Sequence, residues 1–322
     1  MTISVLLTGG LGYLGGRIAQ ALVAGGYLVH CGTRRGEMEA PDWLPEIQMV
    51  TLDWNSNVSL IEACRGVDCI IHLAAMNEVE SATDPVGALE TNGVASLRLL
   101  EAAKSVSVRR FIYFSTAHVY GAPLHGNIDE KTLPRPVHPY AITHKVAEDF
   151  VLAAHDRKQI EGVVIRLSNG FGAPVTPNVD RWTLLVNDLC RQAATRGELR
   201  LNSAGAQLRD FIPLADVARA VIHLLQLDVE QIADGLFNLG GGKAISILEM
   251  AERIAARWRG LTERDIAIVR PAGDSLAPPP FSYRSDKLAA TGFTLTGQID
   301  CEIDDTLQLC LRAFGKLGHH TE

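Results

Sequence analysis

The chain has 322 residues, of which 47% are hydrophobic and 21% charged, an ordinary globular composition. This length is enough for one large domain, or two closely joined ones, with a substantial buried core. The formal net charge of -7 argues against a general nucleic-acid binder, although a few arginines in one place would still hold an anionic substrate.

The cysteines and the apolar segments indicate in which cellular compartment the protein works. The cysteines have neither CxxC spacing nor a neighbouring histidine pattern, and they lie at Cys31, Cys64, Cys69, Cys190, Cys301 and Cys310. We therefore expect no zinc or other metal site and no disulfide framework. The segment TISVLLTGG reaches a glycine turn early, and no run approaches the ~18 apolar residues of a membrane span. We expect a cytoplasmic protein with reduced cysteines, no signal peptide and no membrane partner.

Short apolar runs alternate with helical patterns in the first half of the chain, which is typical of a parallel sheet built from βαβ units. The runs are 3–7, 27–32, 47–52, 68–73, 109–115 and 162–168. Between them, segments such as 17–26 and 84–104 carry leucines and alanines at helical spacing. This order predicts an α/β fold with a Rossmann-type doubly wound parallel sheet. After residue 170 the pattern is less regular, with short strands at LRLN and LFNLG and helices at 245–258 and 304–314.

The first strand leads into TGGLGYLGGRIAQAL, in which Gly9, Gly12 and Gly15 have the spacing GxxGxxG. Glycine allows a tight turn and a close approach of the backbone to a pyrophosphate, and the following helix offers free N–H groups and the positive end of its dipole. A glycine triplet alone is a weak signal, but this one follows a strand and opens a helix. We therefore expect this loop, with Tyr13 and Leu14, to bind a dinucleotide rather than to be a structural turn.

The end of the second strand bears on the choice of cofactor. An acidic residue there would bind the ribose 2′-hydroxyl of NAD, but the chain reads CGTRRGE. Arg34 and Arg35, with Thr33, can instead receive a 2′-phosphate, so NADP(H) is favoured and NAD(H) stays possible. The alternative is a solvated surface pair of arginines. Asp53, at the end of the third strand, is either an adenine contact or a turn residue.

Together with further motifs, these features resemble the extended short-chain dehydrogenase/reductase family, which contains nucleotide-sugar epimerases, dehydratases and reductases. The resemblance covers nearly the whole chain. It is carried by TGGLGYLG, IIHLAA (70–75), Asn92, FSTAHVYG (114–121), PYAITHKVAE (139–148), IRLSNGFGAP (165–174), RDFIPLADVA (209–218), FNLGGG (237–242) and RPAGD (270–274).

The resemblance implies a division of the chain and further cofactor contacts. Residues 1–168, with a returning segment near 211–242, should form the dinucleotide-binding domain. Residues 169–210 and 243–322 should form a smaller C-terminal lobe for the substrate, with the ligand between the two at the carboxyl ends of the strands. The cofactor should also border Leu73, Ala74, Ala75 and Asn92.

The mechanism that the resemblance implies is hydride transfer between nicotinamide and a sugar carbon, while a tyrosine moves the hydroxyl proton. Tyr140 falls at this acid/base position, and Thr116 falls where the family places a Ser or Thr that hydrogen-bonds the reacting oxygen. Family dehydratases have an Asp-Glu pair after that residue, whereas this chain has Ala117 and His118. Dehydration is therefore disfavoured, and His118 either touches the substrate or is simply packed.

A second departure concerns the family lysine four residues after the tyrosine, which holds the nicotinamide ribose and keeps a positive charge near the phenol. Aligning Glu148 with the family's acidic residue places His144, not Lys145, at this position. Residues four apart share a helix face, so Lys145 should point away from Tyr140 unless a π-bulge shifts the register. His144 can make the hydrogen bond but loses its charge near neutrality.

Three residues match positions where the family contacts the nucleotide-sugar: Asn169, Arg209 and Arg270. Two arginines on a diphosphate would hold an anionic ligand on an acidic protein. The alternatives are that Arg209 pairs with Asp210 or Asp216 and that Arg270 decorates a loop.

These features predict an NAD(P)-dependent enzyme that acts on a nucleotide-diphosphate sugar at carbon 4. A ketoreductase is slightly favoured over an epimerase, because two arginines suit NADPH and a histidine beside Tyr140 weakens phenolate formation more than proton donation. The alternative from another class is a catalytically silent NADP-binding sensor or scaffold of the same fold. We expect no nucleic-acid partner, and a homodimer is possible.

Overall fold

A seven-stranded parallel sheet forms the centre of the computed structural model, which describes residues 2–273 and 279–315. In spatial order its strands are β11 (Leu236–Leu239), β7 (Glu161–Leu167), β5 (Arg110–Thr116), β4 (Cys69–His72), β1 (Ser4–Thr8), β2 (Leu28–Thr33) and β3 (Gln48–Thr51). All six pairings are parallel. The predicted Rossmann-type sheet is confirmed, and the six strands expected in the first half all belong to it. The seventh strand returns from the second half of the chain.

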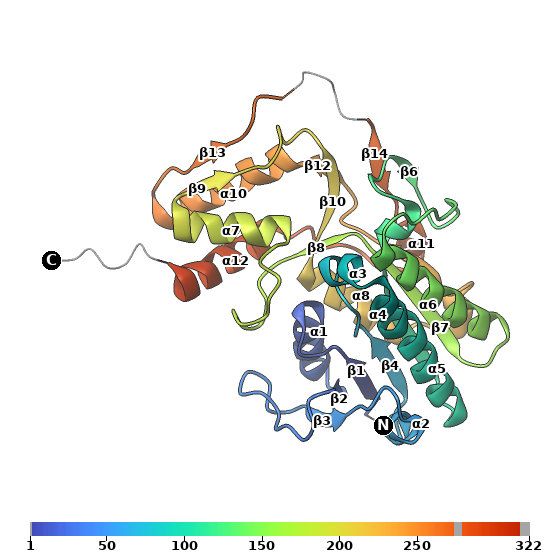
Figure 1. The fold of residues 1–322 in the computed structure, drawn as a ribbon. Helices are drawn as coiled ribbons and strands as arrows, with labels where there is room; N and C mark the ends of the chain where they lie inside the picture. The colour runs from blue at the N-terminus through green and yellow to red at the C-terminus, as the bar shows by residue number, and fades with distance from the viewer. Residues whose placement is uncertain (1, 274–278, 316–322) are drawn as a thin grey trace.

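Helices cover both faces of this sheet, which makes it doubly wound (Figure 1). Helices α1 (Tyr13–Ala24) and α8 (Leu214–Gln226) share one hydrophobic core with the strands. Helices α2 (Asn57–Cys64), α5 (Ala95–Ser105) and α6 (Pro139–Asp156) share the core of the other face. Chain order reverses between β1 and β4, so the loops that follow these two strands meet at the carboxyl edge, where such folds bind ligands.

The segment between β4 and α5 is divided more finely than the single helical pattern at 84–104 indicates. It contains α3 (Glu78–Thr83), α4 (Pro85–Ala88) and η1 (Leu89–Val94), which is a π-helix. Asp84 caps α4 and Pro85 opens it, so one helix ends and another begins at these residues. π-Helical turns are rare and occur often at functional sites.

A smaller lobe is built from the later part of the chain. Its three-stranded sheet contains β8 (Asn169–Phe171), β10 (Leu208–Pro213) and β12 (Ala244–Ser246). Helices α7 (Leu185–Arg196), α10 (Ile247–Thr262) and α12 (Ile299–Phe314) share a separate hydrophobic core, beside the paired β9 (Glu198–Arg200) and β13 (Ala267–Val269). In Figure 1 this group lies at the upper left, away from β1, β2 and β3. The predicted domain boundaries remain our proposal for dividing the chain.

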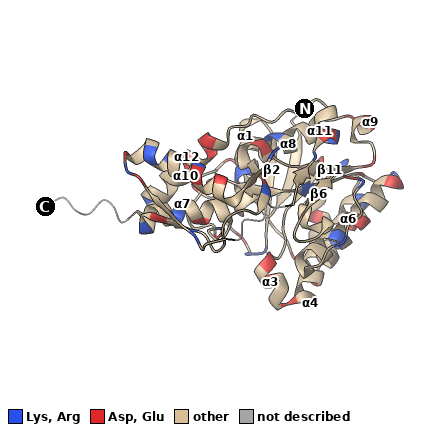
Figure 2. Cartoon of the chain, turned by 90° about the horizontal axis from the view of Figure 1, so that it is seen from above, with Lys and Arg blue, Asp and Glu red and all other residues tan. Residues whose placement is uncertain are grey.

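Short elements complete the described structure. They are η2 (Ala117–Tyr120), β6 (Gly126–Ile128), α9 (Val229–Ile232), β14 (Phe281–Tyr283) and α11 (Asp286–Ala290). Acidic and basic residues are interspersed over the view in Figure 2. Across the residues that the structure describes, no helix is both long and apolar enough to cross a membrane.

Candidate active site

Glycine makes the loop after β1 possible. Gly9 has a φ of +73°, and a Cβ atom on Gly15 would lie 2.1 Å from the Gly9 carbonyl oxygen. A larger residue would therefore be strained at the first position and would clash with backbone at the second. Helix α1 begins after Gly12, and no side chain in the described residues caps its N-terminus. The first N–H groups of α1, on Tyr13 and Leu14, are left for phosphate oxygens, so this loop fits the pyrophosphate of a dinucleotide.

The loop after β4 packs against the loop after β1. The backbone nitrogens of Leu73 and Ala74 donate to Thr8 Oγ1 at 3.3 and 3.4 Å. A Cβ atom on Gly9 would lie 3.0 Å from the Ala74 nitrogen, so the two loops are in close backbone contact. Leu73 and Ala74, followed by Ala75, thus lie at the edge where we expect the cofactor, and their contacts with it remain predictions.

The loops after β2 and β3 are exposed. Arg34 and Arg35 follow Thr33, whose Oγ1 accepts from the Arg35 nitrogen at 3.1 Å. Neither guanidinium has a carboxylate partner among the residues that the structure describes, so both can receive an anion. Asp53 follows β3, and its Oδ1 accepts from the Asn55 nitrogen at 2.9 Å, which is a local turn contact. An adenine contact by Asp53 remains a prediction.

A buried polar chain connects β4 with α6 through η1. His72 Nε2 lies 2.8 Å from Ser96 Oγ, which donates to the Asn92 carbonyl at 2.6 Å. The Asn92 side chain accepts from the Met76 nitrogen at 2.7 Å and donates to Thr143 Oγ1 at 2.9 Å. Asn92 therefore holds the loop after β4 against the start of α6, and its expected contact with the cofactor remains a prediction.

Thr116 and Tyr140 come from packed elements, since Thr116 ends β5 and Tyr140 lies in the first turn of α6, which packs on β5 and η2. His138 caps α6, its Nδ1 accepting from the Tyr140 nitrogen at 3.2 Å. Thr116 is buried, and its Oγ1 accepts from the backbone nitrogen of His118, whose side chain is exposed.

Burial raises the pKa of Tyr140 well above its ordinary value, and the nearby Glu78 carboxylate raises it further. The phenol is therefore a proton donor at neutral pH.

His144 and Lys145 lie on different sides of α6. The ring centroids of His144 and Tyr140 are 4.2 Å apart, and His144 is buried. Lys145 instead forms an ion pair with Asp149, one turn further along the helix. Helix α6 is α-helical from Pro139 to Asp156, so the four-residue register expected from the sequence is the one observed. The π-helix of this fold lies in η1.

A buried ion pair one turn along α6 from His144 has no signature in the sequence. Glu148 accepts two hydrogen bonds from Arg166 of β7, Nε–Oε1 at 3.0 Å and Nη2–Oε2 at 2.7 Å. Glu148 Oε1 also accepts from Ser115 Oγ at 2.5 Å. These contacts fix α6 to β5 and β7, and thereby set where Tyr140 lies relative to Thr116.

Asn169 and Arg209 lie on adjacent strands of the smaller sheet, β8 and β10. Asn169 Nδ2 donates to the Asp210 carbonyl at 2.8 Å. Arg209 is half-buried and reaches only Gln207 Oε1, at 3.4 Å, within the described residues. Burial lowers the pKa of its guanidinium, which nonetheless stays charged at neutral pH.

The two carboxylates proposed as alternative partners of Arg209 are engaged elsewhere. Asp210 Oδ1 accepts from Ser168 Oγ at 2.6 Å, and Asp216 pairs with Arg219 at 2.7 Å. The alternative that Arg209 pairs with Asp210 or Asp216 is therefore wrong, as judged from the contacts of the described residues. The charge of Arg209 remains available to an anionic ligand.

Two further arginines have different surroundings. Arg270 is exposed after β13, and its Nη1 donates to the Ala204 carbonyl at 2.8 Å. No described contact brings it together with Arg209. Arg181 was not among the predicted site residues. It is half-buried and lowers the pKa of Tyr140, against the larger effects of burial and Glu78, which raise it. Its loop has no motif that would have revealed this proximity.

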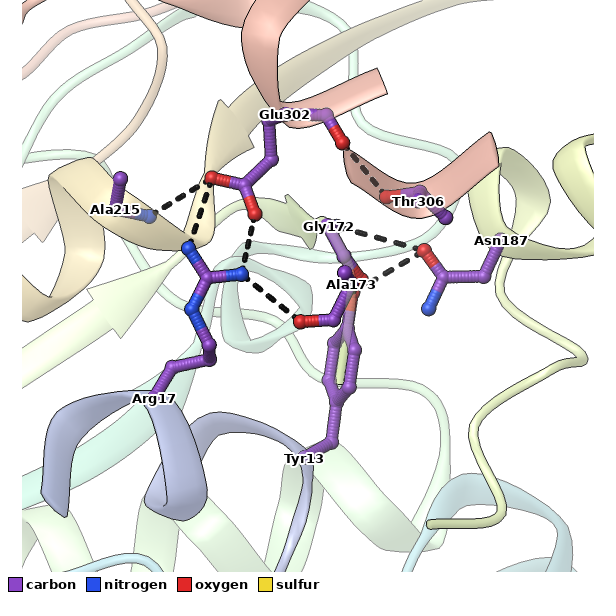
Figure 3. Close-up of polar contacts among 8 residues, drawn as sticks. All are labelled: Tyr13, Arg17, Gly172, Ala173, Asn187, Ala215, Glu302 and Thr306. Carbon is purple, nitrogen blue, oxygen red and sulfur yellow. Dashed lines mark hydrogen bonds and ion pairs between the residues drawn. The ribbon is translucent and has the colours of Figure 1, made fainter. Parts of the chain in front are cut away.

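Helix α1 is tied to the smaller lobe by Tyr13, which Figure 3 shows extending away from the helix. Its hydroxyl lies 3.0 Å from the Gly172 carbonyl and 3.2 Å from Asn187 Oδ1 of α7. The same helix is tied by Arg17, which donates to Glu302 of α12 at 2.6 Å (Figure 3). Gly172 has a φ of +149°, and a Cβ atom on it would lie 2.1 Å from Glu302 Oε1, so a larger residue would be strained there and would have to displace Glu302. The helix expected to hold the pyrophosphate is thus bonded directly to the lobe expected to hold the substrate.

Comparison with known proteins identifies a family. Residues 5–240 match the family model described as "NAD dependent epimerase/dehydratase family". A UDP-glucose 4-epimerase of Rhizobium leguminosarum bv. trifolii is 28% identical over 261 residues, which is 77% of this chain and 80% of that protein. A dTDP-glucose 4,6-dehydratase of Neisseria gonorrhoeae is 27% identical over 292 residues, 84% of this chain and 80% of that protein.

Solved structures show the same fold. MoeE5 in complex with UDP-glucuronic acid and NAD is 27% identical with a TM-score of 0.75, and the match covers 96% of this chain and 99% of that chain. A Thermus thermophilus UDP-glucose 4-epimerase in complex with NAD is 23% identical with a TM-score of 0.76, covering 97% of this chain and 100% of that chain.

Proposed function

Because the chain belongs to the NAD dependent epimerase/dehydratase family, we propose that it oxidises and re-reduces carbon 4 of a nucleotide-diphosphate sugar. The observation that carries this proposal is the placement of Tyr140 at the start of α6, packed on β5, at the edge where the phosphate loop lies. When bound, the nicotinamide supplies the acceptor and donor of the hydride. Tyr140 moves the hydroxyl proton, and Thr116 orients the reacting oxygen.

Relatives named 4-epimerases favour epimerisation over the one-way reduction that the sequence favoured. Relatives named dehydratases are also similar, but Ala117 and His118 lack the carboxylates that elimination needs. An epimerase requires Tyr140 to accept a proton in one half-reaction and to return it in the other.

The test is incubation of the protein with NAD or NADP and UDP-glucose or UDP-glucuronic acid, with the configuration at carbon 4 read by NMR. Tyr140→Phe should lower turnover by about 10²–10⁴-fold, the usual contribution of a general acid–base. Tyr27→Phe is the control, since the Tyr27 hydroxyl contacts only Gln226, at 3.3 Å, in the described structure. Cofactor binding without turnover of any nucleotide sugar would instead support a sensor or scaffold.

For the cofactor, the family is NAD-dependent, and our inference from Arg34 and Arg35 is that the chain also takes NADP(H) and prefers it. Both side chains are exposed beyond β2, where a guanidinium can reach a 2′-phosphate. Calorimetry should show tighter binding of NADP than of NAD, and Arg34→Ala should remove the difference. Arg65→Ala is the control, because this exposed arginine precedes β4 and lies at the opposite edge. Equal affinities in the wild type would refute the preference.

The proposed partner in assembly is a second copy of the chain. Neighbouring helices expose large apolar side chains, among them Val86 (70% exposed) of α4 and Phe150 (43%) of α6. Leu89 of η1 and Ile142 of α6 add to this surface. Sedimentation should show a dimer that Phe150→Glu dissociates and that Val58→Glu, a control on α2, leaves intact. A monomeric wild type would refute this assembly.

We also propose that the protein works in the cytoplasm. All six cysteines are free, and five of them are buried, as expected where thiols stay reduced. Fractionation of cells that express the tagged chain would test this.

A further inference from the structure

His144 has one hydrogen-bond partner within the described structure, and that partner defines where its proton lies. His144 Nδ1 is 2.8 Å from the backbone carbonyl oxygen of Tyr140. A carbonyl oxygen can only accept, so Nδ1 must carry a hydrogen. The remaining question is whether Nε2 carries one as well.

The surroundings of His144 disfavour a second proton. The residue is 2% exposed, and the rings of Tyr140 and Tyr113 lie 4.2 and 6.0 Å away. The carboxylate of Glu148, one turn along α6, is already engaged by Arg166 and Ser115. Burial lowers the pKa of His144 to about 4, against smaller effects in the other direction from the Tyr140 carbonyl and Glu78.

The other titratable ring near this position adds no counter-charge. His72 of β4 has both ring nitrogens in contact with hydroxyls, Nδ1 with Thr8 at 2.6 Å and Nε2 with Ser96 at 2.8 Å. Burial lowers the pKa of His72 to about 3, and the proximity of His144 contributes. Both imidazoles are therefore neutral near pH 7, and His144 Nε2 keeps its lone pair.

We propose that His144 Nε2 accepts a hydrogen bond from a hydroxyl of the bound nicotinamide ribose. This direction is opposite to that of a lysine ammonium, which can only donate. The inference rests on the proposed function, since it needs a dinucleotide in this site. It changes the electrostatics of the site, because a neutral acceptor replaces the fixed cation that would lower the pKa of the Tyr140 phenol.

The chain contains an internal spectroscopic reference for this proposal. His155 lies on the same helix, and its Nε2, not its Nδ1, is 2.8 Å from a backbone carbonyl, that of Ala233. The two histidines should therefore show opposite tautomers when both are neutral. Protein labelled with ¹⁵N-histidine, recorded at pH 7.5 with and without NAD, would report both, with assignment from His144→Gln and His155→Gln.

The expected spectrum has a protonated Nδ1 and an unprotonated Nε2 for His144, and the reverse for His155. The binding arm uses NAD and its two analogues that lack the 2′- or 3′-hydroxyl of the nicotinamide ribose. One analogue should bind the wild type about three- to tenfold more weakly, the net contribution of one neutral hydrogen bond. His144→Leu should weaken NAD binding by the same factor and remove the discrimination between NAD and that analogue.

The outcomes separate this inference from the proposed function. A doubly protonated His144, a proton on Nε2 alone, or equal binding of all three dinucleotides to the wild type would overturn the inference, even if the protein epimerises nucleotide sugars. Failure to bind NAD or NADP at all would overturn the proposed function and the inference with it.

Discussion

The ion pair between Glu148 and Arg166 should be among the most sensitive polar contacts of the molecule. Their side chains are 0% and 3% exposed, and Glu148 also accepts from Ser115. Glu148→Gln preserves the shape but leaves the Arg166 guanidinium without its counter-charge and turns an amide N–H₂ towards a donor. Removal of one partner of a buried pair costs about 3–5 kcal/mol.

This cost converts into a measurable shift in melting temperature. With an unfolding entropy of about 2.1 cal/mol/K per residue, 3–5 kcal/mol corresponds to a decrease of roughly 4–7 °C for 322 residues. Differential scanning calorimetry would measure it. Turnover should fall as well, because Glu148 fixes α6 to the strand that ends in Thr116.

Asp149→Asn is the matched control, since it makes the same chemical change on the next residue of α6. Asp149 is 65% exposed and pairs with Lys145, so its loss should cost less than about 1 kcal/mol. Equal melting temperatures for the two variants would refute the argument. Replacement of Glu148 and Arg166 together by leucine and methionine should recover much of the loss, because apolar residues can substitute for a buried pair.

Three other predictions concern binding, rate and pH. Arg209→Ala and Arg270→Ala should each weaken UDP-sugar binding by about 1.5–3 kcal/mol, with little change in cofactor affinity. Calorimetry on cofactor-loaded protein would measure this. Failure of every nucleoside diphosphate to bind the wild type would refute a nucleotide-diphosphate sugar as the substrate. His144→Lys should raise the rate of substrate oxidation near pH 8, because a permanent cation stabilises the phenolate of Tyr140. Lys145→Ala should change that rate little. If Lys145→Ala lost turnover while His144→Ala stayed active, Lys145 rather than His144 would occupy the family's lysine position. Burial lowers the pKa values of His72 and His144 to about 3 and 4, whereas a histidine of the unfolded chain has a pKa of ~6.5. Below pH ~6.5 the unfolded state therefore binds more protons than the folded state. The free energy of unfolding should fall as the pH is lowered through this range. The two histidines together contribute a slope of about 2.5 kcal/mol per pH unit near pH 5, and denaturation of His144→Gln should show roughly half of that contribution. An unchanged slope would contradict this prediction.

The central sheet could be predicted because its strands β1, β4 and β5 are fully buried and read as short runs rich in apolar residues, whereas the edge strand β3 is partly exposed. All seven residues of β5 are buried, and the predicted run at 109–115 is offset from Arg110–Thr116 by one residue. The glycine turn after β1 was equally readable, since Gly9 and Gly15 are fixed by local backbone geometry, and its contact with a pyrophosphate remains a prediction. The family resemblance placed His144 four residues after Tyr140 through the alignment of Glu148, and helical periodicity then predicted that Lys145 points away from Tyr140.

Contacts between distant segments could not be predicted in this way. Arg17 and Glu302 are separated by 285 residues, and nothing local to either residue indicates the other. The π-helix at η1 was also invisible, because the residues around Asn92 have the same apolar spacing in an α-helix. The charged residues Glu78 and Arg181 act on Tyr140 through space, and single-sequence patterns contain no such information.

The polar contacts of α6 fix the position of Tyr140 more firmly than the proposed substrate-binding arginines are fixed. His138 caps its start, Asn92 bonds Thr143 in the next turn, and Glu148 bonds Arg166 below them. Asn92 lies on η1 and Arg166 on β7, so two neighbouring elements hold α6 in addition to its own cap, and these contacts together position Tyr140. Among the described residues, the arginines proposed for the substrate have fewer contacts, since Arg209 reaches one glutamine and Arg270 one carbonyl. If the proposed function holds, we expect a change of sugar or nucleotide to need few substitutions in the smaller lobe, and a change in the chemistry at carbon 4 to need substitutions in the interior around α6.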